Sequence, residues 1–311
     1  MGKRSDLALF VDQVLDTGQQ TANFVTTKGL TSRSGCSDKN GLRLDRREAV
    51  EQTVVKRRIG LLLVSVTSMP AQWLNYPSKG IPRLPDGKPN LTAPPPKAPD
   101  GKPDLSGIWQ TPAPKYLANI AADLKPGEVP LQAWAAKVLQ ERSQLLHASE
   151  ESNAHCLPPG VPRINATPNA FKVIQIPGET VVLYEAFGLY RQIFTDGREL
   201  PKDPQPSWQG YSAGNWQRDT LVVETAGFNG QTWLDQAGHP TTDALHLTER
   251  FHRRDFGHLD DQITIDDPKA YTRPWTITET FELQPDTELI EFVCENEKDV
   301  EHLKRIGAAG N

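Results

Sequence analysis

The residues best suited to chemistry lie in one loop and in the strand expected after it, within the segment WLDQAGHPTTDALHLTE. Acid–base catalysis needs a proton-transfer group tuned near the working pH, and a histidine beside a carboxylate meets that need. Asp235 with His239 or His246 is the best candidate pair, and Glu249 follows on the strand. These four residues are the candidate catalytic set.

The same residue types are acceptable ligands for zinc or another divalent metal. His239 and His246 are the candidate metal ligands. His246 and Glu249 fall on opposite faces of an ideal strand, so a bulge is needed before both can bind one ion. A divalent metal is therefore one interpretation, no cofactor is certain, and hydrogen bonds that order the loop are the more common role.

Three glutamates stand on strand faces that are otherwise apolar. Side chains two residues apart on a strand face the same way, which places Glu185, Glu249 and Glu279 among large apolar neighbours. A buried carboxylate is costly unless it is paired, coordinated or protonated. Three explanations stay open. The glutamates line a polar cavity, they pair with arginines such as Arg191 and Arg250, or their strand faces point outward.

Aromatic residues gather in SWQGYSAGNW and in the loop already named. Aromatic side chains stack on sugars and aromatic ligands, but in small β-domains they more often fill the core. We consider them, together with the glutamates, as candidate ligand-binding residues: Trp208, Tyr211, Trp216 and Trp233.

Short strands divided by turns are expected from Phe171 onward. The segments are FKVIQI, TVVLYEAF, LYRQIF, DTLVVETA, ALHLTERFHR, DQITID, PWTITETFEL and ELIEFVCE. Their tight connections predict a mainly β fold, an antiparallel up-and-down meander that closes into a barrel. Apolar residues at helical spacing predict one amphipathic helix over 130–149, packed on the barrel.

Composition agrees with short elements joined by turns. The chain of 311 residues has 26 prolines, 23 glycines and a formal charge of -5. No basic stripe for nucleic acid appears, and phosphate-loop and Rossmann motifs are absent from the sequence.

The N-terminal part has the layout of an export signal. Lys56, Arg57 and Arg58 precede an apolar run and then small residues, so 55–71 is a predicted signal peptide, too short to remain as a stable membrane span. We infer a misassigned start, with 1–54 a non-native leader; the alternative is a disordered extension before a buried helix. A Pro-rich arm over 72–104 and one β-rich domain over 105–311 follow.

Two cysteines remain in the exported part of the chain, Cys156 and Cys294. An even pair in a compartment that permits disulfides predicts a bridge between them, whereas two buried free thiols are the alternative. The location expected from the signal and the cysteines is periplasmic or secreted.

Two resemblances support this interpretation. DLSGIW resembles the Gly-x-Trp opening of lipocalin-like barrels, where the tryptophan plugs the closed end. Most of the chain from Gln72 resembles a family of uncharacterised secreted proteins common in soil bacteria, through motifs that include PDGKPDLSGIW, DTLVVETAGFN and ITIDDPKAYT. That family brings no established reaction.

Three functions stay open. The favoured one is an exported barrel that binds a small amphipathic or aromatic molecule in a partly polar cavity. A secreted lyase, isomerase or hydrolase with a His/Asp/Glu site is the second, and a surface structural protein is the third. The expected partner is a small-molecule ligand, not nucleic acid.

Overall fold

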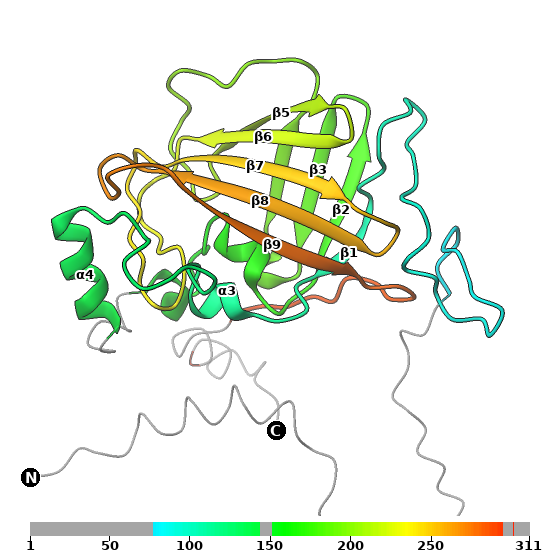
Figure 1. Ribbon diagram of the computed structural model, residues 1–311, viewed down its shortest axis with the longest axis horizontal. Helices are drawn as coiled ribbons and strands as arrows, with labels where there is room; N and C mark the ends of the chain where they lie inside the picture. Colours follow the sequence, from blue (N-terminus) through cyan, green and yellow to red (C-terminus); the bar gives the residue numbers. More distant parts are fainter. Residues whose placement is uncertain (1–76, 144–150, 295–300, 302–311) are drawn as a thin grey trace, which may run out of the picture. The chain divides into compact units, whose positions relative to one another are not determined.

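A computed structural model describes residues 77–143 and 151–294, together with residue 301. Nine strands form a closed barrel in chain order (Figure 1). The strands are β1 Gly107–Gln110, β2 Phe171–Ile176, β3 Glu179–Tyr184, β4 Tyr190–Phe194, β5 Tyr211–Gln217, β6 Thr220–Ala226, β7 His246–Arg253, β8 His258–Asp266 and β9 Trp275–Leu283. The predicted mainly β, barrel-forming meander is confirmed.

One strand pair departs from the antiparallel pattern. β4 and β5 run parallel and are joined through two residue pairs, Ile193 with Ser212 and Phe194 with Ala213. All other neighbours are antiparallel, and β1 completes the ring between β2 and β9. The long connection 195–210 joins β4 to β5, which is what allows the two strands to run parallel.

The barrel interior follows the period of two that the sequence predicts. On β7, Leu247, Glu249 and Phe251 are buried, and on β9 Trp275, Ile277, Glu279 and Phe281 are buried. Trp109 of β1 is fully buried, and its indole N–H donates to the carbonyl oxygen of Leu105 at 3.0 Å. Apolar side chains therefore fill most of the barrel, with a small set of polar ones between them.

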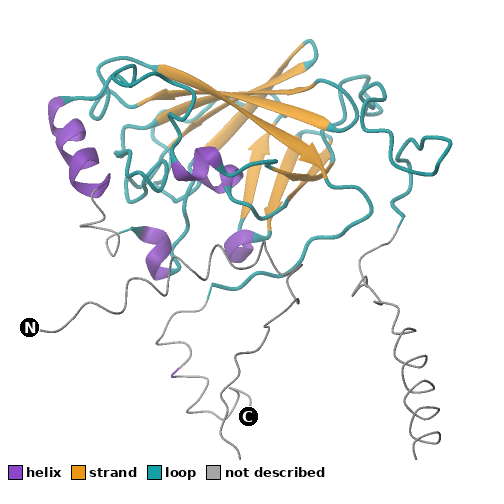
Figure 2. Cartoon of the chain, turned by 60° about the horizontal axis from the view of Figure 1, so that its bottom comes forward, coloured by secondary structure: helices purple, strands orange, loops and turns teal. Residues whose placement is uncertain are grey.

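The two ends of the barrel are covered differently (Figures 1 and 2). At one end, called the arm end, Phe256 and Gly257 donate backbone hydrogen bonds to Ala93 and Leu91 of the Pro-rich arm. At the other, the loop end, lie the short helices α3 Lys115–Ala118, η4 Arg163–Ala166 and η5 Ala186–Gly188, and the long connection 227–245. The arm is thus part of the folded body from residue 77.

The predicted helix begins at Ala133, three residues later than its pattern suggested. α4 spans Ala133–Ser143, and residues 144–150 lie outside the described part. Ala135 is buried, whereas Trp134 is 45% exposed and donates its indole N–H to the carbonyl of Lys269 at 2.8 Å. A single narrow stripe, rather than a broad apolar face, therefore contacts the rest of the protein.

Two strand predictions need correction. ELIEFVCE was expected as a strand, but residues 288–294 form none. β5, with the sequence YSAGNWQ, was not predicted as a strand, because its glycine and polar residues obscure the alternation. The segment instead completes the barrel beside β4, and the open end of the meander is closed by β1.

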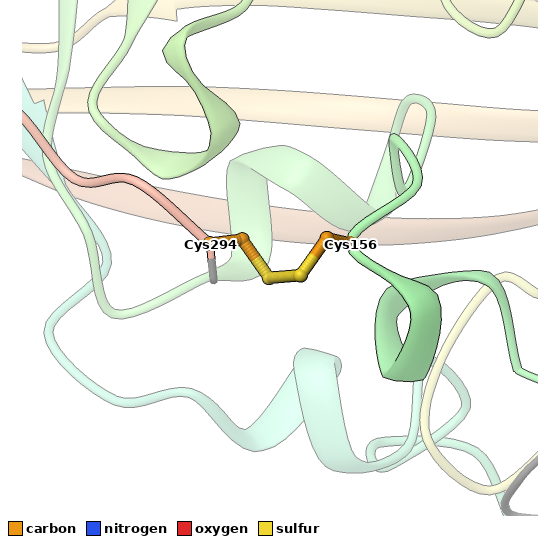
Figure 3. The surroundings of a disulfide bond; sticks show 2 residues. All are labelled: Cys156 and Cys294. Atoms are coloured by element: carbon orange, nitrogen blue, oxygen red, sulfur yellow. A yellow bond between two sulfur atoms is a disulfide. The ribbon is translucent and has the colours of Figure 1, made fainter. Parts of the chain in front are cut away.

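The predicted disulfide is present. Cys156 and Cys294 are bonded, with their Cα atoms 5.5 Å apart (Figure 3). Cys156 follows the short helix η3 Ser152–His155, and Cys294 ends the irregular segment that leaves β9. The bridge attaches this C-terminal segment to the chain between β1 and β2.

The predicted leader and signal peptide, 1–54 and 55–71, lie outside the described residues. Within the described ranges, every helix is too short or too polar to cross a bilayer.

Candidate functional site

A hydrogen-bonded ionic cluster occupies the barrel interior. Arg191 of β4 donates to both carboxylate oxygens of Glu249 on β7, one at 2.9 Å, and forms an ion pair with it. The same guanidinium donates to Ser212 at 3.1 Å and to Thr225 at 2.9 Å, and those two hydroxyls lie 3.0 Å apart. All four side chains are almost completely buried. Of the explanations open for Glu249, pairing with Arg191 is the one observed.

Two further carboxyl groups lie beside this cluster. Asp261 of β8 and Glu279 of β9 are directly opposite each other in the strand register and are 0% and 2% exposed. Their four oxygen atoms have no hydrogen-bond partner among the described residues. Burial, followed by the charge of Glu249, raises the pKa of Glu279 to about 8, and burial also raises the pKa of Asp261. Both groups therefore hold a proton well above the usual acidic range.

A small cavity lies inside the barrel near this cluster. Its volume is about 20 Å³, and Arg191, Tyr184, Asn165 and Thr180 provide its polar lining. Tyr184 donates its hydroxyl proton to Asn165 at 2.9 Å. A cavity needs about 10–15 Å³ to hold one water molecule. This cavity can therefore hold one water molecule but nothing much larger.

A larger pocket lies outside the barrel wall at the arm end, and we call it the arm pocket. Its volume is about 380 Å³. Ile108 of β1 and Lys172 of β2 are register partners and contribute to its lining. Arm residues 78–81 and the segment 284–288 after β9 also line it. The pocket thus exists because two distant parts of the chain meet over β1 and β2.

Hydrogen bonds hold these two segments together. Asp286 accepts from the backbone N–H of Ser78 at 2.8 Å and from both terminal nitrogens of Arg83 at 2.8 and 2.5 Å. The side of the pocket nearest the barrel contains Arg253, whose guanidinium donates to backbone carbonyls, including Ser106 and Phe256. Burial lowers the pKa of Arg253 to about 10, so it remains charged at neutral pH.

The Asp235–His239 pair forms, but at the loop end. His239 Nδ1 lies 2.6 Å from an Asp235 oxygen, and both residues are buried. The Asp235 carboxylate also accepts from the backbone N–H groups of Ile120, Gly238 and His239 at 2.7, 2.8 and 3.0 Å. With this many backbone donors, the carboxylate orders the 233–239 loop against the segment after α3.

The predicted catalytic set is not brought together. Glu249 lies in the barrel interior with Arg191, whereas His246, at the start of β7, lies on the alternate, outward face. No group of three or more His, Cys, Asp or Glu that could hold a metal ion occurs among the described residues. Among the described residues, His239 and His246 therefore belong to no ligand group of the expected kind.

Glu185 differs from the other two glutamates. The buried residues of β3 are Thr180, Val182 and Tyr184, so the expectation that Glu185 shares an inward face was wrong. It follows the strand, where its carboxylate accepts from the backbone N–H groups of Ala170 at 3.0 Å and Ile290 at 2.8 Å. Glu185 therefore fixes the C-terminal segment to the start of β2.

The four aromatic candidates do not form one platform. Trp208 is half-buried in the 195–210 connection. Tyr211, at the start of β5, packs against Phe194 with ring centroids 5.2 Å apart. Trp216, near the other end of β5, lines a separate surface pocket of about 270 Å³. Trp233 is buried at the loop end, where the guanidinium carbon of Arg142 lies 4.1 Å from its ring centroid.

Sequence reasoning missed Asp261 and the arm pocket. Asp261 alternates with Leu259, Ile263 and Ile265 in the same way that Glu249 and Glu279 alternate with their neighbours, so the signal was present. The arm pocket has no comparable local signal, because Ser78 and Asp286 are 208 residues apart.

Neither a protein-family model nor a curated protein matches this chain.

Proposed function

We propose that this protein is an exported barrel that binds a small amphipathic molecule in the arm pocket. The volume and mixed lining of that pocket carry the proposal. Ligand pockets are commonly about 300–1,000 Å³, mostly apolar and supplied with a few polar groups. At about 380 Å³ the arm pocket lies within this range.

The lining suits a molecule with an apolar body and a polar end. Ile81, Ile108, Phe256 and Leu283 provide apolar surface. Charged groups of both signs lie at the same pocket, and Lys172 and Glu288 are 3.5 Å apart in an exposed ion pair. An exposed pair of this kind contributes little to stability, so a ligand group can replace either partner at small cost.

The barrel interior is a less suitable place for such a ligand. Its cavity of about 20 Å³ is closed around one water-sized space, and Arg191 and Glu249 already satisfy each other. A molecule of even five or six heavy atoms would have to displace packed side chains. We therefore place the ligand in the arm pocket and not among the internal glutamates.

We further propose that the protein works in the periplasm or outside the cell. The Cys156–Cys294 bridge supports this, because disulfides persist in oxidising compartments and are rare in the cytosol. N-terminal sequencing of the exported protein is expected to find a first residue near Gln72. Recovery of peptides from residues 1–50 in the native protein would contradict this part of the proposal.

A blocking variant tests the ligand site. Ile108→Trp fills the floor of the pocket, and Ile174→Trp is its control, because Ile174 is 36% exposed on neighbouring β2 and does not line the pocket. The probe is 1-anilinonaphthalene-8-sulfonate, an amphipathic aromatic molecule, titrated against the folded full chain. We expect saturable binding of one probe per chain, weakened at least about tenfold by Ile108→Trp, or about 1.4 kcal/mol, and unchanged by Ile174→Trp.

The alternatives give different results. A purely structural protein would show no saturable binding and no molecule released on denaturation of the purified chain. Binding that is equal in the wild type and both variants would place the probe elsewhere and overturn the arm pocket as the site. Thermal unfolding of all three proteins confirms that the comparison is made between folded chains.

A further inference from the structure

Arg253 is a buried cation at the wall of the arm pocket. It lines the pocket and is only 3% exposed. Its guanidinium donates hydrogen bonds to the backbone carbonyls of Asp104, Ser106, Asp255 and Phe256. Carbonyl oxygens satisfy N–H donors but carry no net charge. The hydrogen bonds of Arg253 are therefore made, while its positive charge is left without a bonded counter-ion.

The carboxylates near Arg253 are used elsewhere. Burial lowers the pKa of Arg253, and the charges of Asp104 and Asp255 only partly offset that effect. Asp255 pairs with His258, whose Nδ1 lies 2.7 Å from a carboxylate oxygen. Asp104 accepts from the backbone N–H of Ser106 at 2.8 Å. In the described part of the chain neither carboxylate forms an ion pair with Arg253, so this wall presents a positive charge that no acid contacts.

The charged side chains that line the arm pocket carry a net positive charge. Lys79, Lys172 and Arg253 are the three basic residues, and Asp104 and Glu288 are the two acidic ones, which leaves a balance of one positive charge. Lys79 forms no ion pair with any described residue. Lys172 lies 3.5 Å from Glu288, and their side chains are 38% and 64% exposed, so this pair is open to exchange.

We infer that the ligand of the arm pocket is an amphipathic anion, an alkyl or aryl carboxylate whose charged end replaces Glu288 beside Lys172. This inference rests on the proposed function and specifies the chemical class of its ligand. An ammonium group donates charge-assisted hydrogen bonds to a carboxylate. The buried charge of Arg253 adds a longer-range attraction, which water at the wall screens only weakly. The apolar body packs on Ile108 and Leu283.

Other end groups suit this lining less well. A cationic end group would lie beside the buried charge of Arg253, and the repulsion between like charges opposes binding. Of the two acids that could attract it, Asp104 already accepts a backbone hydrogen bond. A neutral hydroxyl can form hydrogen bonds but gains nothing from the net charge of the lining. The pocket should therefore rank an anion first.

Displacement of a neutral probe by three alkyl chains of equal length tests the end group. The probe is N-phenyl-1-naphthylamine, and the competitors are decanoate, decan-1-ol and decylammonium, titrated against the folded full chain at neutral pH. Because the probe is uncharged, its binding and its loss in Ile108→Trp report on the pocket itself. We expect decanoate to bind at least about tenfold more tightly than decan-1-ol, and by a larger factor than decylammonium.

Two charge variants should change the affinity for decanoate in opposite directions. Lys172→Gln should weaken it about fivefold, whereas Glu288→Gln should strengthen it about threefold, because the competing carboxylate is removed. Lys88→Gln is the control, because Lys88 is 79% exposed, also belongs to the arm and does not line the pocket. It should leave the affinity unchanged. The affinity for decan-1-ol should be the same in all three variants.

The contribution of the buried cation is tested separately. Arg253→Gln should remove most of the preference for decanoate over decan-1-ol, and thermal unfolding shows whether this variant folds. Where it does not fold, the opposite effects of Lys172→Gln and Glu288→Gln decide the question, since both residues are exposed.

The outcomes separate this inference from the proposed function. Absence of saturable probe binding to the wild type would overturn both. Probe binding that Ile108→Trp weakens, together with equal affinities for the three chains, would keep the pocket and overturn the anionic ligand alone. Tighter binding of decylammonium than of decanoate, or weaker decanoate binding in Glu288→Gln, would also overturn it.

Discussion

Arg191 on β4 and Glu249 on β7 are joined side chain to side chain across the barrel interior, on either side of β5 and β6. On its way to Glu249, the guanidinium also bonds Ser212 of β5 and Thr225 of β6. Backbone pairing between β4 and β5 involves two residue pairs only. The side-chain network therefore strengthens the barrel at one of the two junctions, β4–β5 and β1–β9, whose backbone ladder has only two residue pairs.

Removing one member of this ion pair should destabilise the protein strongly. Arg191→Met leaves Glu249 buried without its cation, and we expect a loss of about 3–5 kcal/mol in the free energy of unfolding. Arg191→Met combined with Glu249→Leu should recover most of it, because no charge is then buried. Urea unfolding of the wild type, both single variants and the double variant measures the coupling. Additive single effects would mean that the two side chains act independently.

Stability should fall as the pH rises from about 4.5 to about 8. Glu279 has its pKa raised to about 8 in the fold, from an ordinary value of 4.5, so within this window the folded state binds a proton that the unfolded state has released. For each such group, the free energy of unfolding falls by up to about 1.4 kcal/mol for each unit of pH. Asp261 adds to it with the same sign, since its pKa is also raised.

The slope can be assigned by substitution. Glu279→Gln should flatten the dependence of unfolding free energy on pH over that window, whereas the exposed Glu282→Gln should leave it as in the wild type. The other ionisable groups near Glu279, namely Glu249, Asp261, Arg191 and Tyr184, are unchanged in both variants. A steeper slope in Glu279→Gln would contradict the assignment.

Loss of the disulfide should weaken both the fold and the arm pocket. Cys156→Ser with Cys294→Ser is expected to lose about 2–5 kcal/mol, because the bridge closes a long loop, with a separation of 138 residues. The segment 284–288 that lines the pocket is then held only by non-covalent contacts. Urea unfolding and probe titration should both respond, and the oxidised wild type treated with reductant should match the variant.

Asp235 should behave as a structural residue. Asp235→Ala removes a carboxylate that accepts four hydrogen bonds, and leaves buried donors unpaired. We expect a loss of about 3 kcal/mol or more in unfolding free energy. Asp243→Ala is a suitable control, because Asp243 is exposed and pairs with exposed Lys269. Equal stability of the two variants would show that Asp235 does not order its loop.

The sequence predicts the barrel well where the pattern is local. The alternation in β7 and β9 identifies Glu249 and Glu279 as inward-facing, since each strand face is set by a period of two. It fails for Glu185, because β3 ends at Tyr184 and the chain turns before the pattern can continue. It also misses β5, whose place beside β4 depends on the tertiary path of the 195–210 connection.

The barrel interior and the arm pocket also differ in how far the sequence predicts them. The interior acids can be recognised on single strands, although Asp261 was overlooked and the pairing of Glu249 with Arg191 was one of three alternatives. The arm pocket cannot be found on any one element. It depends on the meeting of Arg83 with Asp286, which no local pattern of either segment encodes.

The Cys156–Cys294 bridge also sets how the molecule responds to force. Cys156 precedes β2 and Cys294 follows β9, so eight of the nine strands lie inside the covalent ring. Tension applied to the two chain ends passes through the sulfur–sulfur bond and bypasses those strands. β1 alone lies outside the ring, between β2 and β9, and is the strand that a pulling force would peel away first. Under tension the oxidised protein therefore opens first at β1, whereas the reduced protein can be extended along its whole length.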